Sequence, residues 1–127
     1  MAIKITYFVH GTTTDNEAHI SSGWKDVDLS ELGVQQAIGL KDLTKDKKFD
    51  VVFCSDLIRA KRSAELAWKG QYEIIQDKRL RECCYGDFDG KSSEEVEPMQ
   101  EKSINTPMPN GESYEDVKTR INEFLNF

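Results

Sequence analysis

Apolar and β-branched residues gather in three short runs, and each run predicts a strand. Residues 3–8 (IKITYF) mix isoleucine, threonine and aromatic residues without helical spacing, which favours an extended strand whose carboxyl end delivers His10. Residues 50–56 (DVVFCSD) form an apolar run between polar ends, as in a strand buried on both faces of a parallel sheet. Residues 72–76 (YEIIQ) predict a third, shorter strand.

Apolar residues at three- and four-residue steps predict two helices between these strands. Ser30 suits the N-cap of the first helix, whose apolar positions are Val34, Ala37, Ile38, Leu40 and Leu43. The second helix covers residues 57–68 (LIRAKRSAELAW), and Ser55 or Asp56 is its expected cap.

A capping box of Ser113 and Asp116 opens a last helix near the end of the chain. Its apolar face consists of Val117, Ile121, Phe124 and Leu125. Before it, the order strand, helix, strand, helix, strand implies an α/β sheet with right-handed crossovers. Such sheets bind ligands beyond the carboxyl ends of their strands, and His10 and Arg59 both fall at that end.

Two longer stretches show no clear period. Residues 12–28 are polar and irregular, and a loop of that length in a compact domain is expected to cover a site. Residues 81–110 combine mixed charge with the three prolines of the chain, and we expect a short helix near residues 93–100 within them. We interpret residues 87–110 as a lid or insertion in a single domain that spans residues 1–127.

Composition excludes several classes of partner. Lysine and arginine total 17 against 23 aspartate and glutamate residues, a net charge of -6, which argues against charge-driven binding to nucleic acid or to an anionic membrane. No apolar run approaches the roughly 20 residues of a membrane span. The 3 cysteines, without a secretory segment before them, suggest reduced thiols and a cytoplasmic protein.

Three side chains suggest phosphoryl transfer. A neutral imidazole at a strand end, His10, is a nucleophile able to attack phosphorus. Arg59 offers a planar fork for phosphate oxygens, and backbone N–H groups around Gly11 are able to form an anion nest. Glu82 is placed to supply and remove the proton. Taken singly, the same residues are ordinary: a structural histidine, a helix-surface arginine and a solvated charge.

The order of motifs along the chain resembles that of the histidine phosphatase superfamily, the phosphoglycerate mutase-like enzymes. The segment VHGTTTDN is similar to the family's RHGETxxN, and LSELGVQQA is similar to LTxxGxxQA. Further along, CSDLIRAKRSAE resembles SSDLxRAxxTAE, and RLRECCYGDFDG resembles RLRExxxGxWEG. A final element, GES at residues 111–113, is followed by Arg120. The matches extend from the first predicted strand to the last helix.

The resemblance implies a role for each matching residue. His10 corresponds to the phosphorylated nucleophile, Arg59 to a phosphate ligand and Glu82 to the proton donor. Thr13 and Asn16 match the threonine and asparagine of the family's phosphate loop and are expected to line the substrate pocket. The resemblance implies neither a metal nor an organic cofactor.

The family's fold is a three-layer α/β/α sandwich, and its implied activity is that of a phosphatase or phosphomutase. The reaction would pass through a phosphohistidine, and the partner would be a phosphorylated small molecule or a phosphoprotein.

Two departures from the family pattern affect this expectation. Val9 stands where the family has an arginine before the histidine. The family also carries a second catalytic histidine on a strand beyond the GES helix, and the chain stops at Phe127 before such a strand. We therefore expect the N-terminal portion of a longer protein, incomplete at its C-terminus. If it folds alone, an exposed strand edge at residues 3–8 should favour a homodimer.

Two alternatives remain open. Val9 and the missing histidine suggest a non-catalytic phosphate-binding or regulatory module, or an inactive fragment. The segment CSDLIR also places Cys54 before Arg59 at a strand-to-helix turn, as a cysteine-dependent phosphatase would require. Four residues separate this pair and none is glycine, whereas the usual loop of that class has five and is glycine-rich.

Overall fold

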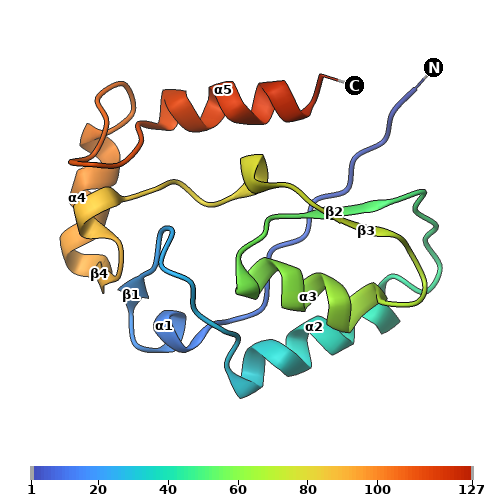
Figure 1. Cartoon of the computed structure of the whole chain (residues 1–127). Coiled ribbons are helices and arrows are strands. Elements are labelled where there is room, and N and C mark those ends of the chain that lie inside the picture. Colours follow the sequence, from blue (N-terminus) through green and yellow to red (C-terminus); the bar gives the residue numbers. More distant parts are fainter. Residues whose placement is uncertain (1, 127) are drawn as a thin grey trace.

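The computed structural model describes residues 2–126. Helices and strands alternate along the chain (Figure 1), with two short 3-10 helices between the third and fourth strands. In chain order the elements are α1 (Thr14–Glu17), β1 (Ile20–Ser21), α2 (Glu31–Leu43), β2 (Val52–Cys54), α3 (Ile58–Trp68), β3 (Ile74–Gln76), η1 (Lys78–Leu80), η2 (Gly86–Phe88), β4 (Lys91–Ser92), α4 (Ser93–Lys102) and α5 (Tyr114–Phe124).

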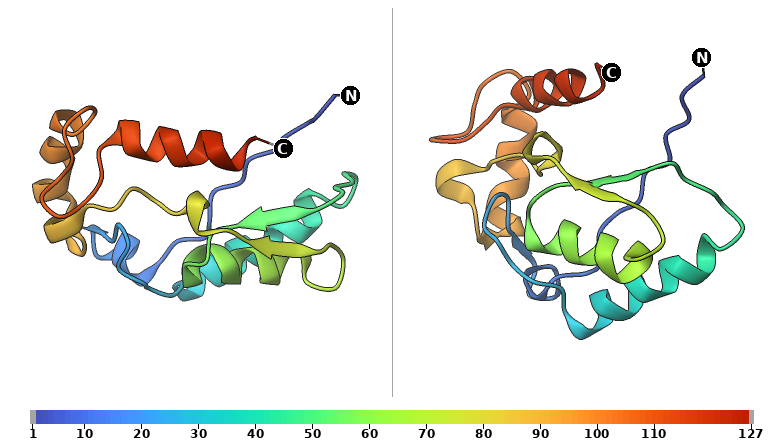
Figure 2. Two further views of the ribbon diagram at one scale, coloured as in Figure 1. Left: turned by 45° about the horizontal axis from the view of Figure 1, so that its top comes forward. Right: turned by 45° about the vertical axis from the view of Figure 1, so that its right-hand side comes forward.

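The strands β2 and β3 form a parallel pair, as the sequence predicts, with Phe53 opposite Ile75. Figure 2 shows α2 and α3 on one side of this pair and α5 on the other, which gives three layers. On the α3 side, Cys54 and Trp68 lie in a buried cluster with Ala64 and Ala67. On the α5 side, the rings of Phe53 and Phe124 meet edge to face at 5.1 Å.

The strand predicted over residues 3–8 is wrong. That segment runs as an extended thread (Figure 1) but is not assigned as a strand and pairs with no other part of residues 2–126. A strand exists only where a neighbour accepts its ladder of hydrogen bonds, and the described residues provide none. Ile5 and Tyr7 are consequently 64% and 83% exposed, whereas the ring of Phe8 packs at 5.1 Å from Trp68.

The predicted helix caps are partly confirmed. The Ser30 side chain accepts a hydrogen bond from Gly33 N and caps α2. The expected cap of α3 is wrong, because its first N–H, that of Ile58, donates to Asp26 Oδ1 at 2.8 Å. The Asp56 carboxylate instead accepts two hydrogen bonds from Arg81.

Residues 12–28 were predicted to be irregular, but they contain two elements, α1 and β1. The strand β1 pairs antiparallel with β4, so Ile20 lies opposite Ser92. This pairing attaches residues 12–28 to the region 87–110, which contains the predicted short helix as α4. Val96 and Met108 from that region are almost fully buried. They share a small buried core with Cys83 and Tyr85, which precede the region, and the action of residues 87–110 as a lid stays a prediction.

The capping box at the start of α5 is confirmed. Asp116 N donates to Ser113 Oγ at 3.1 Å, and Ser113 N donates to Asp116 Oδ2 at 2.9 Å. This helix packs against η1, the 3-10 turn just after β3. No helix within residues 2–126 has the length and apolar character that a membrane crossing requires.

Candidate active site

The turn after residues 3–8 is held against α3 by Ser63. Gly11 N donates to Ser63 Oγ at 2.9 Å, and that hydroxyl donates to Arg59 O at 2.7 Å. Thr12 N in turn donates to Gln36 Oε1. The expected anion nest around Gly11 is therefore wrong, because these N–H groups already have protein acceptors. Their role is to fix the backbone that carries the preceding histidine.

The imidazole of His10 has a defined tautomer. Its Nδ1 lies 2.6 Å from Gly11 O, and a carbonyl oxygen only accepts, so Nδ1 carries the hydrogen. In the neutral ring the lone pair then resides on Nε2. That nitrogen is free to act as a nucleophile, and the His10 side chain lines a polar cavity.

Arg59 enters the same cavity from α3 and is only 4% exposed. Its Nη2 donates to Gly23 O at 2.6 Å and its Nη1 to Lys25 O at 3.0 Å, which uses two of the five donors of a guanidinium. Burial lowers the pKa of Arg59 from its ordinary value, and the charge of Glu82 opposes that shift. Arginine stays protonated in proteins, so a buried positive charge with spare donors faces the cavity.

Thr13 and Asn16 line the cavity, as the resemblance implies. They also cap α1 reciprocally, because Asn16 N donates to Thr13 Oγ1 at 3.0 Å and Thr13 N donates to Asn16 Oδ1 at 2.9 Å. This box does not use the amide nitrogen of the Asn16 side chain, so that group remains as a donor for a ligand oxygen.

Glu82 reaches the cavity from the segment between η1 and η2. Its Oε1 accepts a hydrogen bond from Cys83 N at 2.9 Å, which holds the carboxylate close to its own backbone. The three residues expected to act together, His10, Arg59 and Glu82, thus come from three separate segments of the chain and line one cavity.

The cavity is small and polar. Its volume is about 140 Å³, below the roughly 300 Å³ at which pockets for drug-sized ligands begin. It is lined by His10, Thr13, Asn16, Ile20, Ser21, Ser22, Gly23, Arg59, Glu82, Tyr85 and Ser93. No group of three histidine, cysteine, aspartate or glutamate side chains within residues 2–126 is arranged to hold a metal ion. The space suits a phosphate group and its nearest atoms.

Several lining residues escaped the sequence analysis. Ser21 and Ser93 hydrogen-bond each other at 2.9 Å across the β1–β4 pair, and Ser22 donates to the buried carboxylate of Asp15. Burial raises the pKa of Tyr85, with a further contribution from the charge of Glu82. Tyr85 lies three residues after Glu82 in the RECCYG motif. That proximity was the one feature of the sequence that could have predicted Tyr85 as a lining residue.

The cysteine-phosphatase alternative conflicts with the geometry. Cys54 is 8% exposed, belongs to the core beside Ala64 and does not line the cavity. Burial raises the pKa of its thiol to about 11, so the reactive thiolate is scarce near neutral pH.

This chain is similar to known proteins in both its sequence and its fold. The family model described as the histidine phosphatase superfamily (branch 1) matches residues 7–126. The 2,3-bisphosphoglycerate-dependent phosphoglycerate mutase of Rhizobium meliloti (strain 1021) is 36% identical over an alignment of 126 positions, gaps included, that covers 88% of this chain and 60% of that protein. The fructose-2,6-bisphosphatase TIGAR of Xenopus tropicalis is 35% identical, over 97% of this chain and 48% of that protein.

Solved structures of related enzymes have a similar fold. A mycobacterial glucosyl-3-phosphoglycerate phosphatase, in complex with VO3, superimposes with a TM-score of 0.82 at 27% identity and covers 91% of this chain and 62% of its own. A phosphoglycerate mutase from Thermus thermophilus has a TM-score of 0.77 at 32% identity, with 91% and 67% covered.

The α/β fold therefore places a histidine, a buried arginine and a carboxylate around a cavity that suits a phosphate group. The chain belongs to the histidine phosphatase superfamily and has its phosphoglycerate mutase-like fold. It spans about 60% of the length of the mutase that it matches.

Proposed function

We propose that the chain carries the phosphoryl-transfer site of a phosphatase or phosphomutase, with His10 as the nucleophile. The observation that carries this proposal is the hydrogen bond from His10 Nδ1 to Gly11 O. It leaves the lone pair on Nε2 of a side chain that lines the same cavity as Arg59 and Glu82. The names of the relatives, which are phosphatases and phosphoglycerate mutases, support the same class of reaction.

In the first step, the Nε2 lone pair of His10 forms a bond to phosphorus while the bond from phosphorus to the leaving oxygen breaks. That oxygen takes the proton of the Glu82 carboxyl group and departs as an alcohol. The guanidinium of Arg59 balances the charge that spreads over the three remaining phosphoryl oxygens. The product is a phosphohistidine with Glu82 as carboxylate.

In the second step, an oxygen nucleophile attacks the phosphohistidine. Glu82 now removes its proton, the oxygen bonds to phosphorus, and the bond between phosphorus and Nε2 breaks. Water as the nucleophile gives phosphatase activity, and a substrate hydroxyl gives mutase activity. The small cavity holds the phosphoryl group, so the remainder of the phosphorylated small molecule or phosphoprotein would lie outside it.

The test is detection of the phosphohistidine. The chain is incubated with acetyl phosphate, and we expect one phosphoryl group that is lost in acid and retained in base. His10→Ala should abolish it. The matched control is His19→Asn, because His19 is exposed, lies outside the cavity lining and has a positive φ of 57° that asparagine tolerates. Labelling that persists in His10→Ala contradicts the proposal.

A second candidate is a non-catalytic phosphate-binding module. Two observations favour it: Val9 is 67% exposed in place of an arginine, and Arg59 is the one lysine or arginine lining the cavity within residues 2–126. This function predicts binding of inorganic phosphate that depends on Arg59 and yields no adduct. Calorimetric titration beside the labelling experiment separates the two candidates.

A further inference from the structure

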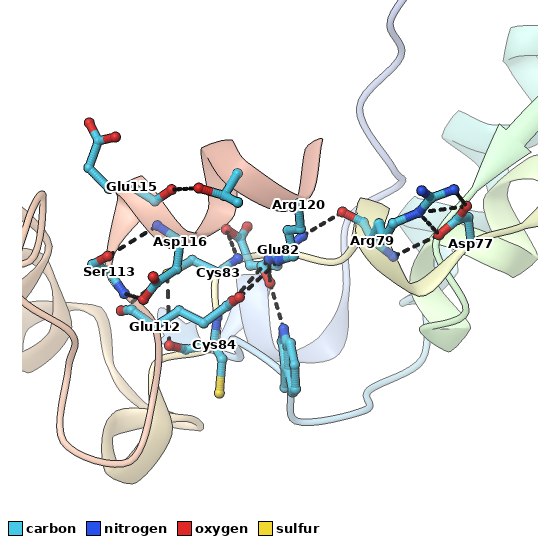
Figure 3. Close-up of polar contacts among 12 residues, drawn as sticks. Asp77, Arg79, Glu82, Cys83, Cys84, Glu112, Ser113, Glu115, Asp116 and Arg120 are labelled. Carbon is cyan, nitrogen blue, oxygen red and sulfur yellow. Dashed lines mark hydrogen bonds and ion pairs between the residues drawn. The ribbon is translucent and has the colours of Figure 1, made fainter. Parts of the chain in front are cut away.

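The arginine near the middle of α5 reaches the segment that carries Glu82 (Figure 3). Arg120 Nε donates to Glu112 Oε2 at 2.9 Å, and its Nη2 donates to Glu112 Oε1 at 3.0 Å. The same guanidinium donates to two backbone carbonyls, from Nη1 to Arg79 O at 2.6 Å and from Nη2 to Glu82 O at 3.0 Å. One side chain thus joins α5 to residues 79–82.

Glu112 continues the connection on the other side of Glu82. Its Oε1 accepts a hydrogen bond from Cys84 N at 2.9 Å, and its backbone N donates to Cys84 O at 2.9 Å. The Arg120 and Glu112 side chains are only 14% and 18% exposed. Solvent screens such a sheltered, bidentate pair less than an ordinary surface pair, so its geometry is well defined.

The carbonyl of Glu82 is also held from the opposite direction. Trp24 Nε1 donates to Glu82 O at 2.7 Å, and Trp24 lies between the two residues whose carbonyls accept the Arg59 guanidinium, Gly23 and Lys25. The Glu82 carboxylate bonds the next backbone N–H, so its position follows from the backbone that these groups hold.

We propose that Arg120 and Glu112 form a positioning pair that sets the Glu82 carboxyl group at the distance from the leaving oxygen that proton transfer needs. The inference rests on the proposed function. Proton transfer requires heavy atoms about 2.6 to 3.2 Å apart, and a displacement near 1 Å costs on the order of 100-fold in rate. A lysine cannot serve four acceptors with one planar fork, so Arg120→Lys releases the segment while keeping the charge.

The choice of leaving group distinguishes positioning from general structural support. An aryl phosphate such as p-nitrophenyl phosphate expels a stable anion that needs little protonation, whereas an alkyl phosphate such as glycerol phosphate needs the Glu82 proton. We expect Arg120→Lys to lower kcat on the alkyl ester about 10- to 100-fold and on the aryl ester much less. An equal loss on both esters overturns the inference.

Arg79→Lys is the matched control. Arg79 lies in the same segment, and its guanidinium pairs with Asp77 at 2.6 Å and lies 5.6 Å from the centre of the Phe124 ring. It does not bond the Glu82 carbonyl as Arg120 does, and lysine retains a positive charge near that ring. We expect this variant to keep the wild-type ratio of alkyl to aryl turnover. A ratio that falls in Arg79→Lys as it does in Arg120→Lys contradicts a specific role for Arg120.

A second measurement needs no turnover. In the wild-type chain the Cys83 N–H donates to the Glu82 carboxylate, so Glu82→Gln should shift the Cys83 amide resonance and speed hydrogen exchange at Cys83. We expect Arg120→Lys to shift the same resonance and to speed the same exchange. Wild-type inactivity on both esters would refute the proposed function, whereas an unchanged Cys83 resonance and exchange rate in Arg120→Lys would refute the positioning pair.

Discussion

Replacing Gly33 by alanine tests the close contact between α2 and the turn at residues 10–12. A Cβ at Gly33 would lie 1.9 Å from Thr12 O, a backbone atom. An ordinary contact begins at 3.4 Å, so the turn and the helix would have to separate by more than an ångström. Thr12 O also accepts hydrogen bonds from the backbone and the hydroxyl of Ser30, and that separation would strain both.

The magnitude follows from two opposing effects. Alanine is favoured over glycine in a helix interior by about 1 kcal/mol. Overpacking against backbone costs about 1 to 3 kcal/mol, and a weakened hydrogen bond to Thr12 O costs about another 1 kcal/mol. We therefore expect Gly33→Ala to lower the free energy of unfolding by about 1 to 3 kcal/mol. The shift should also move His10 and weaken phosphate binding.

Gly39→Ala is the matched control in the same helix, because a Cβ there would meet nothing within 4 Å. It should raise the free energy of unfolding by about 0.5 to 1 kcal/mol. Urea unfolding followed by circular dichroism measures the free energy of unfolding of both variants. An unchanged dependence of that free energy on urea concentration shows that neither substitution alters the denatured state. If Gly33→Ala is as stable as Gly39→Ala, the close approach of the turn to α2 is wrong.

Three further predictions concern the site, the buried thiols and the N-terminal segment. Arg59→Lys should weaken binding of inorganic phosphate about 10-fold in calorimetric titration, because the fork is lost; Arg62→Lys, whose arginine pairs with Asp28 outside the cavity, should not, and equal losses would contradict the role of Arg59. Burial raises the pKa of Cys54 to about 11 and of Cys83 to about 12 from the ordinary 9.0. The folded state therefore holds protons that the unfolded state releases above pH 9.0, so stability should fall as pH rises from there. Urea unfolding at pH 8.5 and 10 checks this, and a Cys54→Ala variant with the same loss as wild type would contradict the assignment. Ile5→Lys should reduce self-association in sedimentation velocity, because Ile5 is 64% exposed on an unpaired extended segment; a monomeric wild-type chain would refute this.

Local sequence patterns predicted the helices well. The Ser30 cap and the apolar spacing predicted α2, and the box of Ser113 with Asp116 predicted the start of α5. Such signals succeed because their physical cause, a side chain bonded to a backbone N–H one turn away, is contained within a few residues. The motifs also identified His10 and Arg59, which the fold brings into one cavity.

Contacts between distant segments were beyond the reach of the sequence. The strand expected at residues 3–8 failed because pairing is a property of two segments and not of one. The cap of α3 comes from Asp26, which lies 32 positions before Ile58. Gly33 stands in the LSELGVQQA motif and Gly39 does not, but the motif does not reveal that only Gly33 meets another backbone.

The composition and order of its residues by themselves determined the class of this protein and its candidate nucleophile. The tertiary structure alone decided which side chains share the cavity with His10 and which groups hold Glu82 in place. These depend on the directions of donors and acceptors that meet only after folding, because a hydrogen bond requires both a short distance and alignment.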